Sequence, residues 1–423
     1  MDRLARRLGL SDAVIIGLGS MLGAGVFVAY APAAAAAGSW LLASLAIAAL
    51  IAYANAIASA RLAAIYPESG GTYIYGRERL GPFWGYLAGW AFVAGKLSSC
   101  AAMAWTIGLY VWPDQARWVA VAAVFAVAAI SYRGITKSAL VTRVIVAVVL
   151  TVLVLVALTL LVLGPANSEV LRGSMPTGPL GVLTGAGFLF FAFAGYARIA
   201  TLGEEVTEPE KTIPRAIPLA LGITVVLYAL IAIALLRARG AELIATDPAP
   251  LATAAAATGL TWADPVVRAT AALAAFGSLL GVLLGVSRTG FAMARDRNLP
   301  PPLAAVHPRF QVPHRAEVAA AVVVILMLLI GQLATSISFS SICVLVYYAI
   351  ANASAQTLPA ETALHRVLPI VGLIGCLVLA VFQPLATVLT AAAVLLIGAI
   401  IWALRHPHGT GPATTSQSRS YGG

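Results

Sequence analysis

Residues 17–27, GLGSMLGAGVF, lie inside the first long apolar segment of the chain and consist largely of small residues. Gly17, Gly19, Ser20, Gly23 and Gly25 fall within nine consecutive positions. Glycine in a helix interior costs about 1 kcal/mol relative to alanine, and non-helical backbone persists in a bilayer only where it lines a cavity or packs on protein. The stretch therefore predicts a break in a membrane helix, or a small-residue face of the GxxxG type against which a neighbouring helix packs.

The composition identifies lipid as the main solvent of this chain. Of its 423 residues, 61% are hydrophobic and only 10% are charged, whereas a soluble domain carries about 25% charged residues. The net charge of +10 comes mainly from basic residues in short loops between apolar segments. These residues are not clustered on one face or in one motif, so we do not expect a nucleic-acid partner. Their positions in loops instead indicate the topology of the protein in the membrane. We therefore expect a multi-pass membrane protein.

Twelve apolar segments follow one another along the chain, and most exceed the roughly 18 residues that cross a bilayer. They predict an all-α membrane protein with about 12 transmembrane helices. The segments are 12–36, 40–65, 82–112, 116–132, 138–164, 179–201, 214–237, 262–294, 316–334, 336–357, 367–384 and 386–404. Residues 1–11 precede them as a short basic N-terminus, and residues 405–423 have the polar composition of a disordered tail.

The distribution of positive charge predicts the orientation of these helices. An even number of spans places both termini on the same side of the membrane. Most loop arginines and lysines fall on that side, whereas the opposite side receives only Arg117, Arg172, Arg237, Arg239 and Arg268. Because cytoplasmic loops carry an excess of Lys and Arg, both termini are expected in the cytoplasm.

A second break is predicted in the sixth apolar segment, within FLFFAFAGYARIATLGEEV at residues 188–206. Gly195 stands in the middle of this run, and Arg198 follows three positions later. An arginine inside a span is costly unless it is paired or hydrated, so the helix is expected to open near this point.

Breaks at corresponding places in two halves of a transporter mark a midplane binding site between inverted repeats. The first and sixth segments lie five segments apart, which suggests two repeats of five helices each. The first repeat would span residues 12–164 and the second residues 179–357, with two further helices in residues 367–404.

The chemistry of the two breaks suits a zwitterion. The N-terminus of a half-helix carries a partial positive charge and free N–H groups, so the amides of Gly23, Ala24 and Gly25 can hold a carboxylate. Freed carbonyls near Phe191 and Ala194 can accept hydrogen bonds from an ammonium group. We therefore expect a main-chain site for the α-amino-acid group.

Two cations in the spans are candidates for coupling and gating. Lys96 lies in GWAFVAGKLSSCAAMAW, residues 89–105, too deep to reach the interface. It either takes up and releases a proton during transport or makes a structural ion pair or hydrogen bonds to free carbonyls. Arg198 either pairs with Glu204 or Glu205 as an inner gate or contacts lipid headgroups.

Four motifs occur in the same order as in a known group of transporters. They are GSMLGAGVF (19–27), YPESGGTYIYGRERLG (66–81), FFAFAGYARIATLGEEVTEPEKTIPRAI (190–217) and SRTGFAMARDRNLP (287–300). In these stretches the chain resembles the amino acid–polyamine–organocation superfamily of permeases. The last motif is most similar to the bacterial branch that resembles the cationic amino acid transporters. Together the motifs cover residues 12 to about 310.

The resemblance implies a leucine-transporter-type fold, in which five plus five helices form an inverted repeat and two extra helices follow. It implies that the substrate carboxylate meets the amides of Ala24 and Gly25. It also implies that the substrate amino group meets the carbonyls of Phe191 and Ala194.

The resemblance further suggests Phe193 and Tyr196 as gate residues, but two positions depart from the family pattern. Many relatives carry an acidic residue at the position of Ala197, and its loss favours neutral amino acids as substrates. Some proton-coupled relatives carry a lysine where this chain has Val149, so that coupling device is expected to be absent.

These observations predict a secondary active transporter of amino acids in the bacterial inner membrane. We expect alternating access around the two breaks, with proton coupling or exchange, and a monomer or homodimer among membrane lipids. A transporter or exporter of cationic amino acids or polyamines is an alternative, as is an amino acid sensor or channel that does not transport. The spans contain no Ser/His/Asp set, zinc motif or phosphate loop, so neither an enzyme nor a cofactor or metal site is expected.

Overall fold

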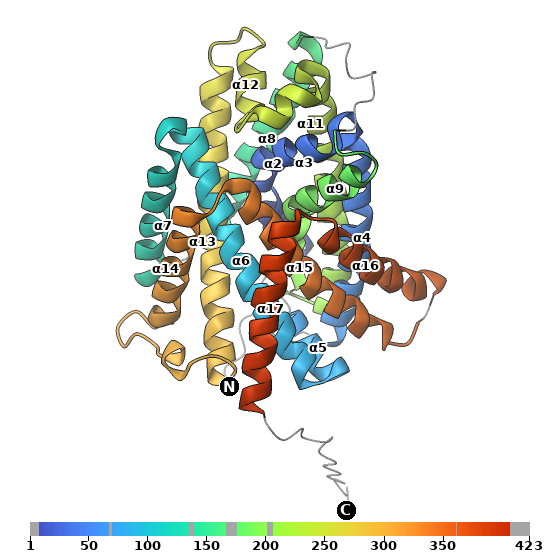
Figure 1. The fold of residues 1–423 in the computed structure, drawn as a ribbon, viewed down its shortest axis with the longest axis vertical. Coiled ribbons are helices and arrows are strands. Elements are labelled where there is room, and N and C mark those ends of the chain that lie inside the picture. Colours follow the sequence, from blue (N-terminus) through green and yellow to red (C-terminus); the bar gives the residue numbers. More distant parts are fainter. Residues whose placement is uncertain are drawn as a thin grey trace, which may run out of the picture.

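The computed structural model describes residues 8–66, 70–134, 139–165, 176–200, 206–360 and 362–406. Helices make up the architecture of this part (Figure 1), and its one β feature is an isolated bridge between Leu8 and Val206. Within these ranges, ten segments are long and apolar enough to cross a membrane. The all-α class is therefore confirmed for the described residues, whereas the count of about 12 spans stays a prediction.

Most helices coincide with predicted apolar segments. They are α4 (Leu41–Ile65), α6 (Pro82–Val111), α7 (Ala116–Tyr132), α8 (Ala139–Leu163), α13 (Ala263–Arg295), α15 (Leu333–Gln356), α16 (Ala363–Val381) and α17 (Leu385–Arg405). Two predicted segments form helices of only 14 and 17 residues, α9 (Leu180–Phe193) and α14 (His314–Ile330). The predicted segment 12–36 forms three helices, which carry the first break described below.

Glycine and proline set several of these boundaries. Gly81 adopts a φ of 110° immediately before α6, and Pro82 occupies the first position of that helix. Proline suits this position because its missing N–H would be unpaired there in any case. Pro384, in an extended conformation, immediately precedes α17 and separates it from α16.

Three helical stretches differ from the sequence prediction. The helix predicted at 214–237 extends in both directions as α11 (Pro209–Thr246), because Pro209 starts it early and the chain resumes a helix beyond a bend at Gly240. Short helices α5 (Thr72–Leu80) and α12 (Pro250–Ala256) occupy connections for which no helix was predicted. Such short helices have too few residues for a clear period in the apolar pattern.

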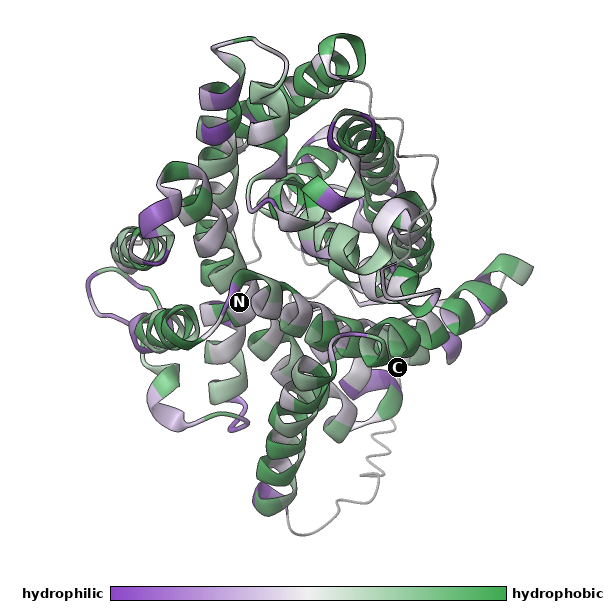
Figure 2. Ribbon diagram, turned by 45° about the horizontal axis from the view of Figure 1, so that its top comes forward, coloured by the Kyte–Doolittle hydropathy of each residue, from purple (hydrophilic) through white to green (hydrophobic). Residues whose placement is uncertain are grey.

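The outer surface carries many large apolar side chains. Figure 2 shows green, hydrophobic ribbon along most helices and purple, hydrophilic ribbon mainly near helix ends and connections. Ile330 is 87% exposed, Val162 76% and Leu385 71%. An apolar exterior of this extent matches lipid as the surrounding solvent.

The buried apolar residues form two clusters. The smaller cluster lies among α6, α7, α13 and α14, and it includes residues such as Met103, Val124, Leu279 and Val324. The larger cluster joins most of the remaining helices. Ala24, in the first break, belongs to the smaller cluster, whereas its neighbours Val26 and Phe27 in the chain belong to the larger one. The first break therefore lies where the two clusters meet.

Buried polar side chains link helices across this interior. Asn352 Nδ2 on α15 donates to Asn55 Oδ1 on α4 at 2.6 Å. Ser99 on α6 and Ser340 on α15 share a hydrogen bond of 2.6 Å between their hydroxyl groups. Both contacts are fully buried, so they fix how α15 lies against its neighbours.

Candidate substrate site at the helix breaks

The first apolar segment is interrupted at the predicted place. Helix α1 (Leu10–Met21) ends where the N–H of Leu22 donates to the Leu18 carbonyl at 2.7 Å. Helix α2 (Gly25–Val28) then starts and leads into α3 (Tyr30–Ala37). Residues 22–24 connect α1 to α2 and are not helical, so the main chain of this short stretch is free to meet other groups.

The amide groups at the start of α2 lack acceptors. Within the described residues, the N–H groups of Gly23, Ala24 and Gly25 donate no hydrogen bond, and all three residues are buried. The next donor along the chain is Phe27, whose N–H reaches the Ala24 carbonyl at 3.0 Å. Buried N–H groups are nearly always paired, and a helix N-terminus favours negative charge. These three amides therefore suit a carboxylate.

The sixth apolar segment is also interrupted at the predicted place. Helix α9 ends at Phe193, a 3-10 turn covers Ala194–Tyr196, and the short helix α10 (Ala197–Ala200) follows. The Ala194 N–H donates to the carbonyls of Phe190 and Phe191. The Ala194 carbonyl accepts from the hydroxyl of Tyr348 at 3.5 Å. Because each carbonyl oxygen has two lone pairs, Phe191 and Ala194 can each accept one further donor.

The two breaks touch each other through their backbones. A methyl group at Gly195 would overlap the Ser20 carbonyl and lie 2.7 Å from Met21 N, at the end of α1. Conversely, a methyl group at Gly25 would lie 2.6 Å from Ala192 Cα, on α9. Each break thus carries a glycine that lets the main chain of the other approach closely.

Other glycines of the first segment contact three further helices. Gly17 faces Ile199 of α10, Gly19 faces Val146 of α8, and Gly23 faces Ser278 of α13. The two interpretations of GLGSMLGAGVF are therefore compatible, because the same small residues interrupt the helix and admit its neighbours.

Tyr228 on α11 contacts the main chain next to both breaks. Its hydroxyl lies 2.6 Å from the Met21 carbonyl and 3.2 Å from the Ala192 carbonyl. Its own carbonyl accepts from the hydroxyl of Tyr30 at 2.9 Å, which ties α3 to the same point. Sequence reasoning missed Tyr228, because nothing in the apolar pattern of α11 distinguishes it from other buried tyrosines.

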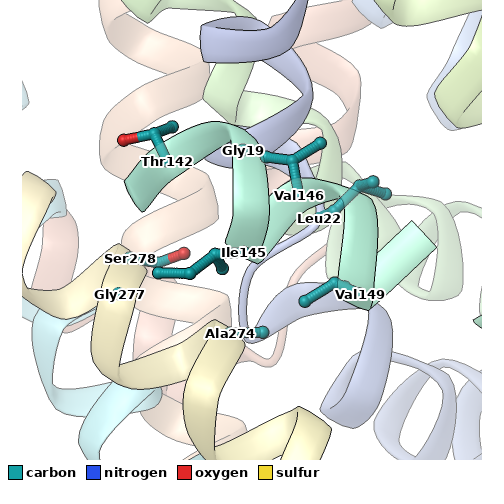
Figure 3. A pocket seen from close by; sticks show the side chains of 9 residues that line it. All are labelled: Gly19, Leu22, Thr142, Ile145, Val146, Val149, Ala274, Gly277 and Ser278. Carbon is teal, nitrogen blue, oxygen red and sulfur yellow. The ribbon is translucent and has the colours of Figure 1, made fainter. Parts of the chain in front are cut away.

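A small cavity adjoins the first break between α1, α8 and α13 (Figure 3). Its lining comprises Gly19, Leu22, Thr142, Ile145, Val146, Val149, Ala274, Gly277 and Ser278. Its volume is about 20 Å³, enough for roughly one water molecule and too small for an amino acid. Val149 contributes an apolar wall here, so α8 presents no cation to the break at that position.

Comparison with known proteins agrees with this architecture. The profile of the amino acid permease family matches residues 8–399. This chain belongs to the amino acid permease family. It is a multi-pass membrane transporter and not an enzyme, as the sequence predicts.

Three relatives illustrate the range of the family. A Mycobacterium tuberculosis protein named as an uncharacterized transporter is 59% identical over 405 residues, which cover 96% of this permease and 92% of the relative. The branched-chain amino acid permease of Bacillus subtilis is 26% identical over 338 residues, covering 74% and 72%. A vacuolar cationic amino acid transporter of Arabidopsis thaliana is 28% identical over 364 residues, covering 80% and 59%.

The aromatic residues suggested as gates of this permease are fully buried. Phe193 lies against the Tyr228 ring, with centroids 5.1 Å apart. Tyr196 stacks on Tyr348 at 5.1 Å and an interplanar angle of 25°. Ser20 directs its hydroxyl back to the Ile16 carbonyl at 3.0 Å, so its carbonyl rather than its side chain faces Gly195.

Among the described residues, no salt bridge joins Lys96 to another group, and its one ring contact is within its own helix. Its ammonium nitrogen lies 6.0 Å from the centroid of the Phe92 ring, one turn earlier on α6. Arg198 is exposed on α10, and its predicted partners Glu204 and Glu205 lie outside the described residues. Both roles therefore stay predictions.

Proposed function

We propose that the permease is a secondary active transporter that holds an amino acid between the two breaks. The amides of Gly23, Ala24 and Gly25 would receive the carboxylate. The carbonyls of Phe191 and Ala194 would receive the ammonium group. The observation that carries this proposal is the row of buried, unpaired N–H groups in one break, in direct backbone contact with the other break.

The proposal includes the predicted repeat architecture. Residues 12–164 and 179–357 would form the two inverted repeats of five helices, and residues 367–404 the last two of twelve spans. Residues 1–11 and 405–423 would lie in the cytoplasm, as the arginine distribution predicts, with the protein in the inner membrane of a bacterium. The support for this arrangement is that both the first and the sixth segments are interrupted, at residues 22–24 and 194–196.

Transport on this scaffold requires helix movement. The cavity beside the first break is too small for an amino acid, and residues 21–30 are all buried. The separate apolar cluster of α6, α7, α13 and α14 provides a unit against which the broken helices can shift. Alternating access would then open the site to one side of the membrane at a time, with Ser20, Gly195 and Tyr196 remaining at the contact between the breaks.

Coupling to protons is the second part of the proposal. Lys96 is only partly exposed within a span, and its ammonium group has no carboxylate partner among the described residues. Such a charge is costly in a membrane, which favours a functional role for Lys96. In this scheme Lys96 exchanges a proton during the cycle, while Phe193, Arg198 and Glu204 serve as gates. A structural role for Lys96 is the alternative.

Neutral amino acids are the proposed substrates. Ala197 supplies no negative charge where many relatives carry an acidic residue. The names of the relatives include both branched-chain and cationic amino acids, so cationic amino acids or polyamines form the second candidate class. A thermal-shift screen of the twenty standard amino acids on purified protein separates these classes, because a bound ligand raises the melting temperature by mass action.

Uptake into proteoliposomes tests the transport mechanism. An imposed inward proton gradient should drive accumulation of the best-binding amino acid above its external concentration. Lys96→Met should abolish or uncouple this accumulation. Lys211→Met is the matched control, because Lys211 is exposed and pairs with Glu208 at 3.2 Å on the surface.

Three results would contradict parts of this mechanism. Normal pH-dependent accumulation by Lys96→Met would remove that residue from coupling. Movement of substrate only down its own gradient would indicate a channel or uniporter. Binding without any movement would indicate a sensor.

A further inference from the structure

A cationic pocket lies at one end of the bundle, away from the two breaks. It has a volume of about 670 Å³, and its lining comprises Ala294, Arg295, Arg297, Leu299, Pro301, Ala304 and Arg405. The pocket lies between the C-terminal ends of α13 and α17, which reach the same end of the molecule in Figure 1. Both helices are long and apolar enough to span a membrane, so their ends are placed at a membrane–water interface.

The three arginines of this pocket form no salt bridge within the described residues. All three are exposed. An Arg405 N–H donates to the Arg297 carbonyl at 3.0 Å, which holds α17 against the end of α13. A guanidinium group has five N–H donors, so most donors of Arg405 are left for another acceptor.

The neighbouring carboxylate, Asp296, is directed to another partner. It accepts a hydrogen bond from the Tyr73 hydroxyl at 2.6 Å, and that hydroxyl also accepts from Asn298 at 3.0 Å. Burial and the hydrogen bond to Asp296 raise the pKa of Tyr73 to about 12, so Tyr73 remains a donor at neutral pH. Asp296 therefore contacts α5 through Tyr73, and it does not line the pocket.

The end of α13 does not need these arginines as caps. Backbone N–H groups of the following turn satisfy its last carbonyls: Asp296 donates to Ala292, Arg297 donates to Ala294, and Asn298 and Leu299 both donate to Met293. Capping of a helix C-terminus by basic side chains is the ordinary structural explanation for such residues, and the backbone already supplies that function here.

We propose that this pocket binds the phosphate of an anionic phospholipid headgroup. Arginine forks match phosphate oxygens in geometry and charge. Basic pockets between membrane helices at the cytoplasmic surface bind anionic headgroups, and the positive-inside rule assigns this arginine-rich end to the cytoplasm. Leu299, Pro301 and Ala304 give the pocket an apolar wall, and Leu404, next to Arg405, is 76% exposed for contact with acyl chains.

Native mass spectrometry of the purified full-length protein tests this proposal. The probes are phosphatidylglycerol, phosphatidylcholine with the same acyl chains, and inorganic phosphate. We expect phosphatidylglycerol to bind at least roughly tenfold more tightly than phosphatidylcholine. The triple variant R295Q/R297Q/R405Q should lose this preference. The control R309Q should keep it, because Arg309 belongs to the connection before α14 and does not line the pocket.

Several outcomes would overturn the proposal. One is an unchanged preference in the triple variant, and another is equal binding of the two lipids by the native protein. If inorganic phosphate displaces phosphatidylglycerol at equal concentration, the site is a free-phosphate site and not a lipid site. Should the triple variant fail to fold, R405Q alone must weaken phosphatidylglycerol binding several-fold, and unchanged affinity in that variant refutes the pocket.

Discussion

Tyr228 illustrates how single residues organise the two breaks. Its hydroxyl lies within hydrogen-bond distance of the Met21 carbonyl, at the end of α1 before one break, and of the Ala192 carbonyl, on α9 before the other. Phe193 packs on its ring, so that α11 fixes α9 through both polar and apolar contacts. A buried carbonyl that loses its donor costs free energy, because no water replaces the lost hydrogen bond.

We predict that Tyr228→Phe lowers the free energy of unfolding by about 1–3 kcal/mol and weakens amino acid binding. Tyr86→Phe is the matched control, because the Tyr86 hydroxyl is equally buried but has no hydrogen-bond partner among the described residues. That control should be neutral or stabilising. Equilibrium unfolding in mixed micelles measures both variants, and equal free-energy changes would contradict the role of Tyr228.

Sequence reasoning could not separate these two tyrosines. Both stand in long apolar segments, and neither has a neighbour in the chain that reveals a partner. The partners of Tyr228 lie 207 and 36 residues away in the chain. Only the packing of α11 against the broken helices brings them together. The helix break at residues 22–24, in contrast, could be predicted, because glycine enrichment in a span is visible in the sequence itself.

Two interrupted helices determine where the candidate site lies. The small residues in the first segment and Gly195 in the sixth predict breaks that are present at residues 22–24 and 194–196. The sequence did not reveal that the breaks touch, or that α11 extends to Thr246. Contacts between distant segments and helix ends depend on tertiary packing, whereas loss of helix propensity is local.

The contact between the breaks predicts a specific effect of added volume. Gly195→Ala should destabilise the protein by about 1–3 kcal/mol or more, because its methyl group meets the backbone of Ser20 and Met21 rather than a movable side chain. It should also reduce amino acid binding. The measurements are the melting temperature and the affinity for the best-binding amino acid.

Gly222→Ala provides the control for that substitution. Gly222 lies in α11, and a methyl group there would meet nothing within 4 Å. Alanine should be neutral or stabilise the helix by up to about 1 kcal/mol. If Gly195→Ala behaves like Gly222→Ala, the breaks do not need the close backbone contact that we describe.

The whole molecule combines a lipid-facing exterior with two internal apolar clusters that meet at the first break. Composition and hydropathy predicted the membrane environment and the all-α class, because both follow from the number and length of apolar segments. The division into two clusters could not be predicted, since it depends on which helices become neighbours. This division places Ala24 at a boundary between two groups of helices, where relative movement would open and close a site.

We propose that main-chain groups of the two breaks bind both charged ends of an amino acid. Binding of three ligands with the same side chain tests it most directly: the best-binding amino acid, its amine without the carboxylate, and its acid without the amino group. Titration calorimetry on the purified protein should show each analogue at least roughly tenfold weaker, because each leaves charged hydrogen bonds unmade. An amine or an acid that binds as tightly as the amino acid would contradict the claim.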